Sequence, residues 1–319
     1  MTATHRLPVV PAALTVALGS VIAVQSRVNG ELAVHGDTGL VPAWWTMTTG
    51  LVMLAVIVAV HRPTRRGLAD AWSAVREGSL PLATLTGGVF GGLFLITQAI
   101  AVPLVGVSVF LVGVVAGQTA GSLLVDRLGI SASGVRHVTW NRVAASIMAV
   151  LAVAIAISDR LESTSGAFGY AVLAFIAGFN VAPQQAANGR VAVRARSPLA
   201  AAFVNFVGGV LMLTVFLVAA MVLLDTRVPD PWGAPWWAYL GGLLGLTVIA
   251  GAAWVVPVLG VLVFSLLSVL GQLAGALLLD LLLPTEGSAI GWHLLAGVAM
   301  TFAAVVVASG RRVSHGSAR

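Results

Sequence analysis

Apolar blocks of about twenty residues recur along the whole chain, and short clusters of Gly, Pro or Arg separate them. Twenty helical residues cover a hydrocarbon core about 30 Å thick, so each block has the length of one membrane span. Blocks such as 51–60 and 148–157 are apolar on every side, whereas strands of a transmembrane barrel alternate apolar and polar residues. Only 9% of the 319 residues are charged, too few to cover a water-soluble surface. The sequence therefore predicts an all-α polytopic membrane protein surrounded by the lipid bilayer.

We expect ten transmembrane helices, because ten such blocks can be separated along the chain. Their predicted bounds are 8–28, 42–61, 80–102, 104–125, 139–158, 166–188, 199–224, 236–256, 259–281 and 290–309. The third and fourth spans meet at 103–106, and the eighth and ninth meet at 257–260. Pro and Gly in both short junctions indicate tight turns.

The arginines indicate how the chain is oriented, because short cytoplasmic loops retain Lys and Arg. All seventeen basic residues are arginines, and a cytoplasmic N-terminus leaves only Arg27, Arg160 and Arg227 on the outer side. We therefore expect a multi-pass protein of the cytoplasmic membrane with both termini cytoplasmic. The location of most arginines in cytoplasmic loops also explains the net charge of +6, so the charge does not indicate a nucleic-acid partner.

An internal repeat divides the chain into two halves, 1–160 and 161–319. Residues 87–128 match residues 241–282 at a constant offset of 154, with 19 identities in 42 positions. The motif GQxAGxLLxD occurs in both segments, and QxxxNG occurs at Gln25 and again at Gln184, at an offset of 159. Each half holds five predicted spans, and an odd number makes the second half enter the membrane from the opposite side. The sequence thus predicts two inverted five-helix repeats.

The ten-span layout and the motifs QxxxNG and GQxxGxLLxD resemble the drug/metabolite transporter superfamily, specifically its YdcZ-like, EamA-related branch. The resemblance covers nearly the whole chain and implies a secondary transporter fold. It names a class of transporter and not a cargo. The chain departs from a perfect repeat at Ser26 and Arg27, which correspond to Gln185 and Ala186.

Amide side chains inside the predicted spans are the candidates for contact with a substrate. Gln25 and Asn29 share one helix face, as do Gln184 and Asn188, because each pair is four residues apart. The deeper amides near span centres complete the set: Gln98, Gln118, Asn205 and Gln272. Amides in hydrocarbon need hydrogen-bond partners, so these side chains either line a substrate path or bond to neighbouring helices. The sequence leaves both interpretations open.

Three carboxylates are candidates for carrying coupling protons: Glu31, Asp126 and Asp280. Burial raises the pKa of a carboxyl group toward the working range, which suits such a role. The alternatives are an ion pair with Arg27 for Glu31, and the capping of a loop at the membrane edge for the two aspartates. Glycines at 113, 117, 121, 271 and 275 have the spacing that lets helices approach closely, and we expect them to serve packing.

These features together predict a secondary transporter that moves a small organic solute by alternating access, as an exporter rather than an importer. A passive facilitator or lipid-flipping protein is the main alternative, and an integral-membrane lipid enzyme is a further one. No cofactor is expected, because the chain has no cysteine and no HExxH motif. Its span centres hold neither Lys nor Arg, which argues against a multiply anionic cargo. A homodimer stays open, because one sequence does not reveal oligomeric state.

Overall fold

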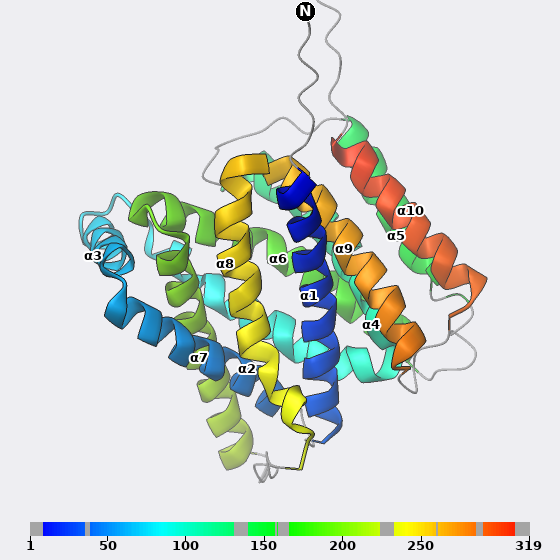
Figure 1. Ribbon diagram of the computed structural model, residues 1–319, viewed down its shortest axis with the longest axis horizontal. Coiled ribbons are helices and arrows are strands. Elements are labelled where there is room, and N and C mark those ends of the chain that lie inside the picture. Colours follow the sequence, from blue (N-terminus) through cyan, green and yellow to red (C-terminus); the bar gives the residue numbers. More distant parts are fainter. Residues whose placement is uncertain are drawn as a thin grey trace, which may run out of the picture.

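The structure, a computed structural model, describes residues 9–35, 39–130, 140–156, 158, 166–223, 233–259, 261–284 and 290–309. Every regular element in these ranges is a helix, which confirms the all-α fold class. The helices are α1 (Val9–Val34), α2 (Leu40–Val60), α3 (Arg62–Arg76), η1 (Leu82–Thr86), α4 (Gly87–Leu128), α5 (Trp140–Ala156), α6 (Ala167–Ala195), α7 (Pro198–Leu223), η2 (Trp236–Leu240), α8 (Gly241–Leu259), α9 (Val261–Leu282) and α10 (Trp292–Ser309) (Figure 1).

The long apolar helices make the chain a multi-pass membrane protein. By length and composition, five helical segments of the described chain can each cross a bilayer: Val9–Val34, Leu40–Val60, Leu82–Val125, Ala167–Ala195 and Pro198–Leu223. Shorter apolar helices cover most of α5, α8, α9 and α10. The number of spans therefore stays a prediction, although apolar helices occupy the ten predicted regions.

The element α4 consists of two helices that meet at a kink, and the kink falls within the predicted junction 103–106 of the third and fourth spans. Pro103 lies inside α4, and Gly106 interrupts it with a non-helical backbone at φ 79° and ψ 163°. A positive φ of this size suits glycine, which has no Cβ to clash with the backbone. In the second half, α8 ends at Leu259 and α9 begins at Val261, on either side of the position that corresponds to Gly106 at the offset of 154.

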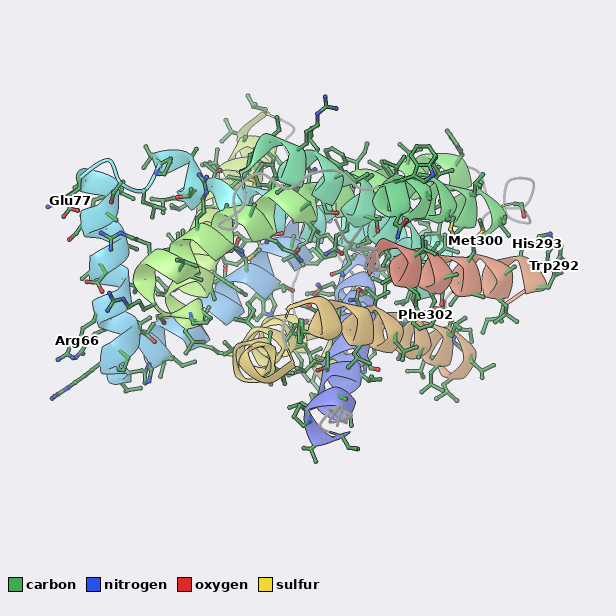
Figure 2. The ribbon with its side chains drawn as sticks, turned by 90° about the horizontal axis from the view of Figure 1, so that it is seen from above. Arg66, Glu77, Trp292, His293, Met300 and Phe302 are labelled. Carbon is green, nitrogen blue, oxygen red and sulfur yellow. The ribbon has the colours of Figure 1, made fainter. Side chains whose placement is uncertain are left out.

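A further helix follows α2 directly, in the segment between the second and third predicted spans, where no helix is predicted. This helix, α3, is too polar to cross a bilayer, because four arginines and Asp70 fall within its fifteen residues. Gly67, Ala71 and Ala74 are buried along one face, against α6 and the start of α7. In Figures 1 and 2, α3 lies at one edge of the molecule and the paired helices α5 and α10 lie at the other.

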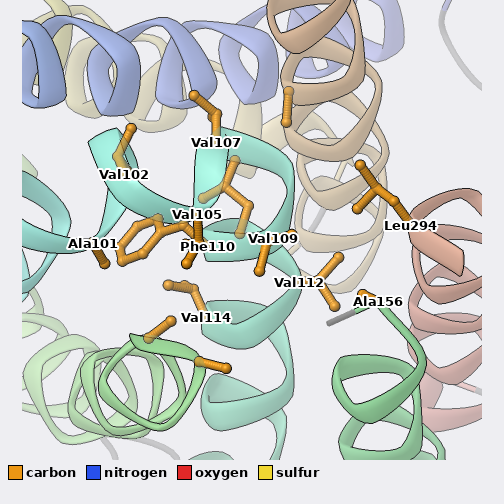
Figure 3. Close-up of a cluster of buried hydrophobic side chains, with 14 of the residues drawn as sticks. Ala101, Val102, Val105, Val107, Val109, Phe110, Val112, Val114, Ala156 and Leu294 are labelled. Carbon is orange, nitrogen blue, oxygen red and sulfur yellow. The ribbon is translucent and has the colours of Figure 1, made fainter. Parts of the chain in front are cut away.

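The middle of α4 forms the centre of the protein. Residues 105–117 of this helix are all buried, and they pack with parts of α1, α5, α6, α9 and α10. Figure 3 shows this cluster, in which Phe110 lies among Ala101, Val105 and Val114. An apolar core of this kind gives the bundle a fixed centre around which the polar side chains described below are placed.

Close backbone contacts join helices that come from different halves of the sequence. A Cβ added to Gly117 of α4 would overlap the carbonyl oxygen of Phe175 in α6, and one added to Gly271 of α9 would overlap that of Val16 in α1. Small residues at such contacts let helices approach closely in a membrane. The expectation that these glycines serve packing is therefore confirmed.

These contacts recur at equivalent positions of the two halves. Gly178 of α6 lies against the carbonyl oxygen of Val114, and Gly19 of α1 lies against that of Ser268. The two glycines are 159 residues apart and their two partners 154 residues apart, which are the offsets of the sequence repeat. Element starts recur as well, since η1 and η2 begin 154 residues apart at Leu82 and Trp236.

Candidate functional site

Two sets of polar side chains lie where the glycine-rich starts of α4 and α8 meet their neighbours. We call Ser26, Asn29, Thr46 and Gln98 the first polar group, and Gln184, Asn188 and Asn205 the second polar group. The first group comes from α1, α2 and α4, and the second group from α6 and α7. Both consist of uncharged hydrogen-bonding side chains within long apolar helices.

The first polar group forms a connected chain of hydrogen bonds. Thr46 donates its hydroxyl to Asn29 Oδ1 at 2.7 Å, and Asn29 Nδ2 donates to Gln98 Oε1 at 2.6 Å. Gln98 Nε2 donates to Ser26 Oγ at 2.7 Å, and Ser26 donates to the Ile22 carbonyl at 3.0 Å. All four side chains are buried, and Gln98 is 0% exposed. The polar atoms of this group are therefore occupied with one another.

The second polar group is more open. Gln184 Nε2 donates to Asn205 Oδ1 at 3.3 Å, a longer bond than those in the first group. Among the described residues, the Asn188 amide has no hydrogen-bond partner, and Gln184 and Asn188 are only partly buried. Amides in this state can accept and donate hydrogen bonds to another molecule.

Glycines in α4 provide the space for the second polar group. A Cβ added to Gly91 would lie 2.7 Å from Gln184 Nε2, and one added to Gly87 would lie 2.6 Å from Asn188 Oδ1. A side chain at either position would push the amides away, because real Cβ contacts are longer than this. The absence of a side chain on this face of α4 therefore leaves the space that the two amides occupy.

Gln25 lies at the corresponding position in the other half of the molecule. Its Nε2 atom donates to the Gly241 carbonyl of α8 at 2.9 Å, and the side chain is partly buried. A Cβ added to Gly245 would lie 2.8 Å from this nitrogen and 3.9 Å from Phe206 Cζ. Gln25 and Gln184, which are 159 residues apart in the sequence, thus both face a glycine near the start of a helix.

The remaining predicted amides lie apart from these groups. Gln272 of α9 is buried and donates to Ser268 of the same helix at 3.3 Å, beside the close contact with α1. Gln118 of α4 is partly buried and has no partner among the described residues. The structure does not bring these two glutamines together with either polar group.

Asp280 fixes the interruption of α4. This buried carboxylate of α9 accepts hydrogen bonds from the backbone nitrogens of Val107 at 3.2 Å and Ser108 at 2.9 Å. These nitrogens open the helical segment that follows Gly106, and the first amides of a helix have no partner within it. A carboxylate at such a position also interacts favourably with the helix dipole. The side chain of Asp126, its counterpart, lies outside the described residues.

Glu31 lies near the end of α1 and pairs with a neighbour on the same helix. Its Oε2 atom is 2.9 Å from Arg27 Nη1, and both side chains are mostly buried. His35 Nδ1 lies 3.8 Å from Glu31 Oε1, in the next turn. Among the described residues, no group of three His, Asp or Glu side chains could hold a metal ion.

Ser26 and Thr46 belong to the first polar group but were not among the predicted site residues. Both are single hydroxyl residues in apolar helices, where such side chains commonly bond to the carbonyl four residues earlier. Ser26 does form that bond, and it also accepts one from Gln98. The one available signal was the repeat, since Thr46 occupies the position that Asn205 holds in the second half.

Comparison with protein families identifies the chain. Residues 10–155 and 169–307 match the model of a family described as "Putative inner membrane exporter, YdcZ". The two matched segments cover most of both halves and leave out only the region between them and the two ends. The search of curated proteins and the search of solved structures found no match. The chain belongs to the YdcZ family of membrane exporters within the drug/metabolite transporter superfamily.

Proposed function

We propose that this protein is a secondary transporter that exports a small neutral or zwitterionic organic solute by alternating access. The second polar group carries the proposal, because Gln184 and Asn188 are partly buried amides within an apolar helix and retain hydrogen-bonding capacity. Family membership supports export. Uncharged donors and acceptors suit a cargo without net charge, since a multiply anionic solute would need fixed cations nearby.

The two polar groups have different roles in this proposal. In the first group, Asn29 and Gln98 satisfy one another and their neighbours, so they stabilise the contact of α1, α2 and α4. In the second group, Asn205 orients Gln184, and Gln184 and Asn188 bind the solute. Gln25 faces the solute from the other half once its bond to the Gly241 carbonyl opens.

We further propose that the chain crosses the membrane ten times as two inverted five-helix repeats. Three observations support this: the constant sequence offsets, the recurrence of the glycine contacts at those offsets, and the kink at Gly106, whose equivalent position lies between the end of α8 at Leu259 and the start of α9 at Val261. Inverted repeats can exchange conformations, which gives an inward-open and an outward-open state of similar energy. The solute then meets the amides from either side of the membrane.

Cysteine labelling tests whether the second polar group is reached from both sides. The chain has no cysteine, so each introduced cysteine is the only thiol. In membrane vesicles of either orientation, we expect Asn188→Cys to react with an impermeant maleimide, because both states expose it. Ser26→Cys is the matched control on the other half and should stay unlabelled, since Ser26 is buried in the first polar group. Reaction of Asn188→Cys from one side only would contradict alternating access.

A transport assay tests the amides directly. Inverted vesicles are given an isotope-labelled mixture of amino acids and nucleosides, and the solutes that accumulate are identified. We expect Gln184→Leu and Asn188→Leu each to lower accumulation about fivefold, because a lost hydrogen bond to the substrate weakens binding by about 1 kcal/mol. Gln185→Leu is the control, since Gln185 is the exposed neighbour on α6. Equal flux in all variants would remove the second polar group from the path.

Coupling to protons is part of the proposal, and Glu31 and Asp280 are its described candidates. In the unmodified protein, an imposed proton gradient should drive accumulation of the solute in the inverted vesicles. In a variant that lacks the coupling carboxylate, either Glu31→Gln or Asp280→Asn, the gradient should no longer drive accumulation. Flux that ignores the gradient in the unmodified protein would favour a passive facilitator instead.

A further inference from the structure

The helix α3 has two faces of different character. Its buried face consists of small side chains at Thr64, Gly67, Ala71 and Ala74, spaced three or four residues apart as one helical stripe requires. A Cβ added to Gly67 would lie 2.5 Å from the Ala195 carbonyl oxygen at the end of α6. This face is thus held against the bundle, and α3 cannot turn to hide its other face.

The other face carries most of the charge. The exposed residues of α3 include Arg62, Arg65, Arg66, Asp70 and Arg76, which leaves a net charge of +3 from four arginines and one aspartate. Figure 2 shows the Arg66 side chain pointing away from the body of the molecule at the edge that α3 forms. We call this exposed side of α3 the arginine face.

An exposed tryptophan lies on the arginine face. Trp72 is 53% exposed, and the Arg76 guanidinium carbon lies 5.4 Å from the centre of its ring. Indole rings favour the headgroup level of a membrane, where one side of the ring meets hydrocarbon and the other meets water. An indole and four guanidinium groups on one short helix match the mixed character of that layer.

The position of α3 brings the arginine face to the membrane boundary. Only His61 separates α3 from α2, a helix long and apolar enough to cross the bilayer, so α3 begins where α2 leaves the hydrocarbon. Arg65 Nη1 donates to the Ala59 carbonyl at 2.9 Å, which holds α3 close to the end of α2. The helix is therefore at the depth of lipid phosphates and too polar to lie deeper.

We propose that the arginine face of α3 binds anionic phospholipid headgroups, with Arg66 and Arg76 contacting the phosphates and Trp72 inserting beside them. Guanidinium groups recognise phosphate with paired hydrogen bonds, and basic residues next to a membrane span attract anionic lipids. This site is separate from the second polar group, so it does not depend on the proposed transport.

Titration of phosphatidylglycerol into the purified full chain, followed by native mass spectrometry, tests the proposal. We expect Arg66→Gln and Arg76→Gln each to weaken binding about fivefold, which corresponds to about 1 kcal/mol for each arginine near an anionic membrane surface. Arg127→Gln is the matched control, because Arg127 is also exposed but lies at the end of α4. Equal affinity of Arg66→Gln and Arg127→Gln would overturn the proposal.

Two further measurements identify the ligand and its place. Inorganic phosphate at the lipid concentration should leave the bound lipid in place, and displacement would mean a site for free anions instead. Vesicles of phosphatidylglycerol with brominated chains should quench tryptophan fluorescence less in Trp72→Phe than in the unmodified protein. Unchanged quenching in Trp72→Phe would place the ring away from the lipid and refute its insertion. Matching melting temperatures show that the variants are folded.

Discussion

Replacing Gln98 by leucine tests the first polar group most directly, because leucine keeps much of the volume and removes both hydrogen bonds. The variant loses the bond that Gln98 donates to Ser26 and the one that it accepts from Asn29. Interhelical hydrogen bonds in membranes contribute about 0.6 kcal/mol each, so the two bonds account for about 1.2 kcal/mol. The Asn29 donor is then buried without an acceptor, which costs about 1–3 kcal/mol more.

We therefore expect Gln98→Leu to lower the free energy of unfolding by about 2–4 kcal/mol. The measurement is reversible unfolding in mixed micelles by titration with a denaturing detergent. Gln185→Leu, at an exposed position of α6, controls for adding a leucine and should change stability by less than about 0.5 kcal/mol.

A double-mutant cycle with Asn29→Leu separates the hydrogen bond from the packing. When Asn29 is already replaced, Gln98→Leu no longer leaves the Asn29 amide buried without an acceptor. The loss of unfolding free energy caused by Gln98→Leu should then be smaller by about 1 kcal/mol or more. Equal costs of Gln98→Leu in both backgrounds, or a cost no larger than that of Gln185→Leu, would refute the connected network.

Three other changes test the remaining features. Gly117→Ala should sharply reduce the yield of folded protein, because a Cβ there overlaps the Phe175 carbonyl oxygen, whereas Gly169→Ala, with open space around it, should leave the yield unchanged in the same detergent-extraction assay. Asp280→Asn should lower the free energy of unfolding by about 1.5–3 kcal/mol, since it weakens charge-assisted bonds to Val107 and Ser108, while the exposed Asp70→Asn should have no measurable effect. Arg65→Cys and Arg194→Cys should react with an impermeant maleimide from the same side of the membrane, and labelling from opposite sides would contradict the predicted orientation.

The apolar blocks and the repeat predicted most of the fold because lipid allows few alternatives. A block of twenty apolar residues has to be a helix in hydrocarbon, and the described helices fall at the expected places. The helix α3 was missed because its signal is a stripe of small residues and not of large apolar ones. Gly67, Ala71 and Ala74 have helical spacing, but such a stripe becomes a buried face only when α6 is close by.

The candidate site was harder to predict than the fold. From sequence alone, Gln25 and Gln184 are equally good candidates for contact with a substrate, because the motif QxxxNG is the same in both halves. The same holds for Asn29 and Asn188. Their surroundings differ at other positions: Gln98 completes the first group, whereas the second half has Ala252 at the matching position. Which amides are occupied and which are available depends on such neighbours, and only the three-dimensional arrangement identifies them.

The close pairing of α1 with α9 and of α4 with α6 has a consequence for how the chain assembles. Each pair joins a helix from before residue 160 with one from after it, through backbone contacts that leave no room for a side chain. Residues 1–160 alone therefore lack the partners of α1 and α4, and residues 161–319 alone lack the partners of α6 and α9. Separately expressed, the fragments 1–160 and 161–319 should be degraded one at a time and accumulate only when both are synthesised in the same cell.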